Sequence, residues 1–201
     1  MKVIGITGGV GSGKTKILEY LKKNTECEIL VADQIANHLK EPGEKCYLAL
    51  VDLLGNGILK EDGSICREKM ASLIFCNESL LQAVNDCVHP LVKEYILQRI
   101  QEEREKKQLK VIFLEAALLI EAGYQPYLDE LWYIYVEKEE RVRRLSLGRN
   151  YSREKTESII RCQLSEEAFQ EQADLVIDNS KEFEETIKQL EAECSKRQLW
   201  K

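Results

Sequence analysis

A glycine-rich stretch near the beginning of the chain, GITGGVGSGKTKIL, restricts the possible folds more than any other part of the sequence. The residues around its start, Lys2–Thr7, are apolar, largely β-branched and bounded by glycine, which predicts a strand. The residues at its end, Lys14–Asn24, have a helical pattern. A strand that turns through glycines directly into a helix is an arrangement that binds phosphate groups.

Within this stretch, Gly8–Thr15 matches G-x-x-x-x-G-K-[ST], the pattern of a phosphate-binding loop or P-loop. Glycines let the backbone approach phosphate oxygens, and the dipole of the following helix favours an anion. Lys14 can reach the β- and γ-phosphates of a nucleoside triphosphate, and the Thr15 hydroxyl can ligate Mg²⁺. We expect the triphosphate to contact Gly9, Val10, Gly11, Ser12, Gly13, Lys14 and Thr15. The alternative is a glycine-rich turn with an incidental lysine; the spacing does not fit G-x-G-x-x-G dinucleotide binding.

Four further segments have the composition of strands, and helical patterns separate them. Most are continuous apolar runs, which is typical of parallel strands that are covered on both faces. They are Cys27–Ala32, Lys110–Glu115, Glu130–Val136 and Ala173–Asn179. Together with the first strand they predict an α/β fold with a central five-stranded parallel sheet and right-handed crossovers.

The spacing of the strands predicts two helical additions to this sheet. Residues 34–109 have helical periodicity and little strand signal, and a connection of that length is an insert rather than a loop. Residues 145–172 are rich in charge and in helix formers, a composition that suits a mobile lid. We therefore expect a single domain with a core of 1–33, 110–144 and 173–201, an insert of 34–109 and a lid of 145–172.

Charge and cysteine content narrow the possible partners and the compartment. The net charge is −6 and no basic stripe dominates, which argues against a nucleic-acid partner. The seven cysteines are odd in number and lack Cys-x-x-Cys spacing, which argues against a disulfide framework and a zinc site. No segment is apolar enough to cross a membrane, and the first apolar run is too short for a signal peptide. These features predict a cytoplasmic protein without a membrane partner.

An acidic residue, Asp33, follows the second predicted strand. At this place it would face the phosphate crevice and could accept the proton of an attacking hydroxyl. Aspartate is also a favoured N-cap, so Asp33 could instead cap a helix over Gln34–Leu39. The residues alone leave both interpretations open. We find no N-K-x-D stretch of the kind with which GTPases read guanine.

Several motifs, taken in order and spacing, resemble the dephospho-CoA kinase family over nearly the whole chain. These enzymes phosphorylate the ribose 3′-hydroxyl of dephospho-CoA in the last step of coenzyme A synthesis. The matching stretches are the loop with its double glycine, VADQIA at 31–36, EPG at 41–43, EDGSICREKMASLIF at 61–75, VHPLV at 88–92, ALLIE at 117–121, RRLSLGRN at 143–150 and ADLVIDN at 173–179.

The resemblance implies a P-loop NTPase fold with ATP and Mg²⁺, with dephospho-CoA as the acceptor. It implies that Asp33 is the catalytic base and that Lys14 and Arg144 are catalytic. Arg149 would close with Arg144 on the ATP phosphates, and Asn179 would lie near the adenine. The acceptor-binding residues that it implies are Asp33 at the end of the core segment 1–33, Arg67 and His89 in a helical CoA-binding insert, and Leu118 and Glu121 in the ALLIE motif.

Four of these assignments have structural alternatives. The arginine-rich segment could be a solvated helix face, above all at Arg141 and Arg143. His89 could be a hydrogen-bonded core histidine, and Arg67 could pair with a neighbouring acid. Asn179 could simply cap the loop after the last strand.

The chain also departs from the family pattern. Val31 stands at the first aspartate of D-A-D, Asn37 at an arginine, Ala117 at the proline of P-L-L, Phe169 at a lysine and Lys181 at a glycine. Glu115 is unusual at the end of its strand. It could act on Mg²⁺ through water or simply face solvent, and we favour the second interpretation.

Two other functions remain open from the sequence. One is a different small-molecule kinase, such as a nucleoside monophosphate kinase, although the proline often found in the loop of such enzymes is absent from Gly8–Thr15. The other is a non-catalytic protein that binds ATP. We expect a monomer or a small homo-oligomer in each case.

Overall fold

The computed structural model describes residues 1–75, 77–116 and 118–201. The chain divides into two compact units. The first comprises residues 1–30 and 103–201, and the second comprises residues 31–102. Cys76 and Ala117 lie outside the described residues, and so does the departure from the family pattern at Ala117.

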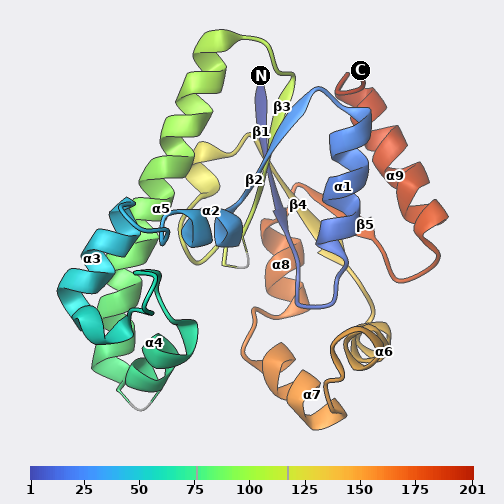
Figure 1. The fold of residues 1–201 in the computed structure, drawn as a ribbon. Coiled ribbons are helices and arrows are strands. Elements are labelled where there is room, and N and C mark those ends of the chain that lie inside the picture. Colours follow the sequence, from blue (N-terminus) through green and yellow to red (C-terminus); the bar gives the residue numbers. More distant parts are fainter. Residues whose placement is uncertain (76, 117) are drawn as a thin grey trace. The chain divides into compact units, whose positions relative to one another are not determined.

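A five-stranded parallel sheet forms the centre of the first unit (Figure 1). Its strands are β1 (Lys2–Thr7), β2 (Cys27–Val31), β3 (Val111–Glu115), β4 (Glu130–Tyr135) and β5 (Leu175–Asp178). They lie in the order β2-β3-β1-β4-β5, so β1 is central. The predicted α/β fold with a five-stranded parallel sheet is confirmed, and the predicted strands match with ends that differ by two residues or fewer.

The apolar sequence of the central strands explains their position. Ile4 and Ile6 of β1, Ile112 and Phe113 of β3, and Trp132 of β4 have no exposed surface. Such continuous burial needs a cover on both faces of the sheet, which is why these runs do not alternate. The parallel register pairs Gly5 with Leu114 and with Leu131, so the three central strands end on the same edge. That edge carries the glycine loop.

The remaining regular elements of the first unit are helices. They are α1 (Lys14–Asn24), α6 (Lys138–Arg149), α7 (Arg153–Arg161), α8 (Glu166–Gln172) and α9 (Phe183–Lys196), with a short 3₁₀ helix, η2 (Gln125–Tyr127). Helices α1 and α9 lie side by side (Figure 1). Tyr20 joins them, because its hydroxyl donates to Glu191 at 2.9 Å and its ring meets Phe183 edge-on.

The second unit is helical, as its sequence predicts. It contains α2 (Ala32–His38), α3 (Lys45–Leu54), the 3₁₀ helix η1 (Asn56–Ile58), α4 (Arg67–Ile74) and most of α5 (Glu78–Lys106). Cys46 and Leu50 of α3, Ile58 of η1 and Ile96 of α5 are fully buried. Assignment of 34–109 and 145–172 to an acceptor-binding insert and a lid is a statement about function and stays a prediction.

Phe169, one of the departures from the family pattern, has a structural explanation. The side chain is 4% exposed and its ring stacks on Tyr133 of β4, with centroids 4.9 Å apart and planes 7° from parallel. A lysine ammonium in the same place would lose its hydration, which is costly without a charged partner. Phe169 therefore anchors α8 to the sheet.

One finding bears on membranes. In the part of the chain that the structure describes, no helix has both the length and the apolar character that spanning a bilayer requires.

Candidate active site

The glycine loop connects the buried end of β1 to the beginning of α1. Gly13 is the N-cap of α1 and has φ 83° and ψ 19°, a left-handed conformation that L-residues avoid. A Cβ at Gly13 would also lie 2.6 Å from Nδ2 of Asn179. Since the first N–H groups of a helix have no acceptor within the helix, the loop presents amides to an anion.

Lys14 folds back over the loop rather than extending into solvent. Its Nζ donates to the carbonyl oxygen of Gly8 at 2.8 Å and lies 3.5 Å from a carboxylate oxygen of Glu115. Both side chains are mostly buried, at 15% and 14% exposed. The interpretation of Glu115 as a solvent-facing residue is therefore wrong. The end of β3 holds its carboxylate beside the loop lysine.

Asn179, directly after β5, links the loop to α9. Its Nδ2 donates to the carbonyl oxygen of Ser12 at 2.8 Å, and its Oδ1 accepts from the Thr186 hydroxyl at 2.8 Å. The side chain is buried, because Asn179 is 4% exposed. Asn179 therefore fixes the loop where it enters α1.

Arg144 of α6 reaches the same place. Its Nη2 donates to the carbonyl oxygen of Asn179 at 2.8 Å, and its Nε donates to Glu140 at 2.7 Å. Glu140 also accepts two hydrogen bonds from Arg143. These hydrogen bonds lower the pKa of Glu140 to about 2, with Arg143 the larger cause and Arg144 the second. Glu140 thus holds the Arg144 guanidinium against the backbone that follows β5.

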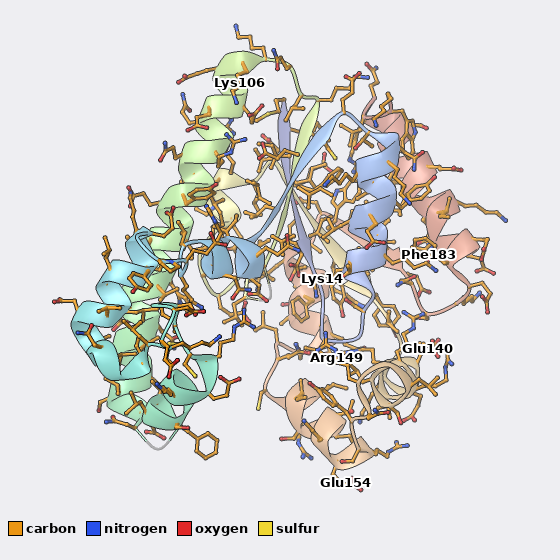
Figure 2. The ribbon with its side chains drawn as sticks, viewed as in Figure 1. Lys14, Lys106, Glu140, Arg149, Glu154 and Phe183 are labelled. Atoms are coloured by element: carbon orange, nitrogen blue, oxygen red, sulfur yellow. The ribbon has the colours of Figure 1, made fainter. Side chains whose placement is uncertain are left out.

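A cavity of about 470 Å³ opens beside these residues. Gly13, Arg144 and Asn179 border it together with Lys16 and the segment 180–184. Figure 2 labels Glu140 and Phe183, which border it from α6 and from the beginning of α9. Its volume lies within the range of small-molecule sites. It lies next to the N-terminus of α1, so a ligand there could extend a phosphate group to the loop amides.

The residues around the loop fit a magnesium–nucleotide complex. Among the described residues no group of three or more His, Cys, Asp or Glu side chains could hold a metal ion. Mg²⁺ does not need such a cage, because it usually binds one or two protein oxygens together with substrate phosphates. The exposed Thr15 hydroxyl and the Glu115 carboxylate are oxygen donors of that kind.

Comparison with known proteins assigns this site to a family. The family model "Dephospho-CoA kinase" matches residues 2–185. A dephospho-CoA kinase of Carboxydothermus hydrogenoformans is 36% identical over 190 residues, which cover 94% of this chain and 91% of the relative. One of Streptococcus mutans is 33% identical over 197 residues and covers 98% of both chains. This chain belongs to the dephospho-CoA kinase family. The family resemblance of the sequence motifs is confirmed.

Solved structures agree on the fold. A crystal structure from Thermus thermophilus matches with a TM-score of 0.78, 29% identity and 97% coverage of both chains. The dephospho-CoA kinase of Campylobacter jejuni has a TM-score of 0.71 at 21% identity, covering 96% of this chain and 97% of its own. These matches support the P-loop NTPase fold that we predicted.

In the first unit of this dephospho-CoA kinase family member, the structure gathers some predicted site residues around the loop. Lys14, Arg144 and Asn179 lie there, and the side chain of Asn179 contacts the glycine loop at Ser12; its place near the adenine stays a prediction. Arg149 is exposed at the end of α6 (Figure 2). The two remaining predicted residues, Leu118 and Glu121, are exposed in the turns after β3.

In the second unit, the structure decides between some structural alternatives. Helix α2 begins at Ala32 with Val31 as its N-cap, so the alternative in which Asp33 caps a helix over Gln34–Leu39 is wrong. Asp33 lies exposed in the first turn. His89 is exposed on α5, which contradicts a core histidine. Arg67 donates to Oδ1 of Asn37 at 3.0 Å, so its observed side-chain partner is an amide rather than an acid.

Sequence reasoning missed the place of Arg141 beside the loop. We expected Arg141 on a solvated helix face with Arg143, and only Arg143 is exposed. Arg141 is 5% exposed and bonds to the backbone of Val10. A signal was present, because Arg141 precedes Val142 and lies four residues before Leu145, on the apolar side of the helix.

The low pKa of Glu140 predicts a pH-dependent contribution to stability. A carboxyl whose folded pKa is about 2, against 4.5 for the free group, stabilises the fold fully above about pH 4.5. That contribution is lost as the pH falls towards about 2. Glu140→Gln should therefore lower the free energy of unfolding by about 1 kcal/mol or less at neutral pH. The difference from wild type should shrink on acidification.

Urea unfolding at about pH 7 and about pH 3.5 measures this difference. Glu171→Gln, at an exposed carboxyl on α8, is the matched control and should behave like wild type. A difference between Glu140→Gln and wild type that stays constant across this range would refute the assignment.

Proposed function

We propose that the protein transfers the γ-phosphoryl group of ATP to the ribose 3′-hydroxyl of dephospho-CoA, giving coenzyme A and ADP. The observation that carries this proposal is the family match over residues 2–185, which includes the glycine loop and Asp33. The geometry around the loop supports the ATP half of the reaction. The described cysteines are free thiols, which suits the reducing cytoplasm in which we propose that the protein works.

The ATP phosphates would lie on the loop amides between Gly9 and Thr15, with the nucleoside in the 470 Å³ cavity beside them. Lys14 is held by Gly8 and Glu115 at the edge of the loop, close enough to move onto the β- and γ-phosphates. Arg144 is fixed by Glu140 and by the backbone of Asn179. Its guanidinium would therefore stabilise the negative charge that develops on the phosphates in the transition state, without first having to reorganise.

The Thr15 hydroxyl and, through water, the Glu115 carboxylate would hold Mg²⁺. When bound, the ion would supply positive charge that offsets the negative charge of the phosphates. In the absence of Mg²⁺, Glu115 would still pair with Lys14 and keep the Lys14 ammonium oriented across the loop.

On the acceptor side, Asp33 would take the proton of the 3′-hydroxyl. The hydroxyl oxygen then forms a bond to the γ-phosphorus while the bond from that phosphorus to the β–γ bridging oxygen breaks, and ADP leaves. Arg67, His89, Leu118 and Glu121 would contact dephospho-CoA. The insert 34–109 and the lid 145–172, which carries Arg149, would exclude water, because water would otherwise take the phosphoryl group.

An acceptor panel tests this proposal. We expect ADP release to be stimulated by dephospho-CoA and not by AMP, CMP or shikimate, with Mg²⁺ required. The product should be coenzyme A by mass spectrometry, with the phosphate on the ribose 3′ position by phosphorus NMR.

Two outcomes would contradict the proposal. Activity on AMP or CMP without activity on dephospho-CoA would assign the protein to nucleoside monophosphate kinases. Tight ATP binding without turnover on any acceptor would make it a non-catalytic ATP-binding protein.

Replacing the proposed base should separate catalysis from binding. We expect Asp33→Asn to lower kcat by about 10²-fold or more, in the range of a lost general base, while the Kd for ATP stays close to that of wild type. The matched control is Asp52→Asn, at an exposed aspartate of α3. Near-normal turnover in Asp33→Asn would remove Asp33 from this role.

A further inference from the structure

The loop is held from outside by a side chain that the reaction does not use. Arg141 projects from α6, and its Nε donates to the carbonyl oxygen of Val10 at 3.1 Å. Its Nη2 donates to Oε1 of Gln163 at 2.7 Å, and the same Oε1 accepts from the N–H of Val10 at 3.3 Å. Both backbone polar groups of Val10 are thus bound by side chains from distant parts of the chain. We call Arg141, Gln163 and Val10 the loop clamp.

The clamp is costly, which distinguishes it from ordinary packing. Arg141 is 5% exposed, and burial lowers its pKa, although Tyr133 and Glu166 favour the charged form. Among the described residues, its hydrogen-bond acceptors are a carbonyl oxygen and an amide oxygen, and both are uncharged. A buried charge with only neutral acceptors is a poor source of stability, and an apolar residue of similar size is often tolerated in its place.

The guanidinium of Arg141 also explains why residue 9 is a glycine. A Cβ at Gly9 would lie 2.9 Å from Nη1 of Arg141 and closer still to Cζ and Nη2. Gly9 is not among the described residues with positive φ, so an alanine could adopt its backbone conformation. The guanidinium is therefore the obstacle to a side chain at Gly9.

We propose that Arg141 is a positioning residue that fixes the loop for ATP through Val10 and ties Gln163, in the predicted lid, to the same point. This inference rests on the proposed function, because it assumes that the loop binds ATP. A loop whose backbone is already fixed at Val10 needs little reorganisation when ATP binds. The free energy that reorganisation would cost is then available as affinity for the triphosphate. Gln163 reaches Val10 only as long as the segment after α7 stays against the loop.

The test is the Kd for ATP with Mg²⁺, measured by calorimetry without an acceptor. We expect Arg141→Met and Gln163→Met each to raise the Kd by about tenfold, the effect of one lost hydrogen bond to a charged group or of a loosened loop. Arg141→Lys should weaken binding nearly as much, because a single ammonium cannot reach Val10 and Gln163 together. The Arg141→Met/Gln163→Met double variant should bind no more weakly than the weaker single variant.

Gly9→Ala provides the reciprocal test. In the wild-type background it should displace the guanidinium and raise the Kd for ATP to a similar extent. In the Arg141→Met background it should raise the Kd much less. Arg153→Met is the matched control, since this exposed arginine of α7 pairs only with Glu139 and Glu157 among the described residues. It should leave the Kd unchanged.

Each contrary result overturns the clamp in a different way. Full affinity in Arg141→Lys would mean that charge alone matters. Full affinity in Gln163→Met, or additive losses in the double variant, would mean that the two side chains act separately. Lower melting temperatures with unchanged Kd would make Arg141 merely structural. Failure of dephospho-CoA turnover in wild type would instead refute the proposed function, and the comparison of ATP affinities would still be valid.

Discussion

The structure depends on one change of direction, the turn from the buried central strand β1 into helix α1. The strand is apolar on both sides because both faces of the sheet are covered at this central position. The helix must begin where Gly13 adopts a left-handed conformation. Between them the backbone leaves amides without acceptors inside the helix, and an anion is the natural partner for such a site. The other features of the site stabilise this turn or use it.

Side chains from distant parts of the chain hold the loop. Asn179, after β5, binds the carbonyl of Ser12, and Arg141, on α6, binds the carbonyl of Val10. Lys14 spans the loop from Gly8 to Glu115 at the end of β3. These contacts come from the last residue of β3, from the helix after β4 and from the residue after β5, so the shape of the loop depends on the assembled sheet. A loop fixed in this way can stabilise charge in a transition state without first rearranging.

The sequence predicts the fold well because local signals and burial agree in it. The limits of β1 and α1 follow directly, since glycines bound an apolar run on one side and a helical pattern on the other. The burial of Arg141 has a weaker sequence signal, its place on the apolar side of α6. Its partner Gln163 lies 22 residues further along the chain, and a basic helix usually faces solvent. Glu115 was misjudged for a similar reason, because its pairing with Lys14 requires the β1–β3 register.

The central claim is that the glycine loop binds the triphosphate of ATP while Asp33 accepts the proton of the acceptor hydroxyl. It is tested most directly by a crystal structure with a non-hydrolysable ATP analogue, Mg²⁺ and dephospho-CoA. The account predicts phosphates surrounded by the amides between Gly9 and Thr15, and a ribose 3′-hydroxyl about 2.6–3.2 Å from the Asp33 carboxylate. Phosphates bound elsewhere, or an Asp33 carboxylate that no acceptor hydroxyl can reach, would contradict it.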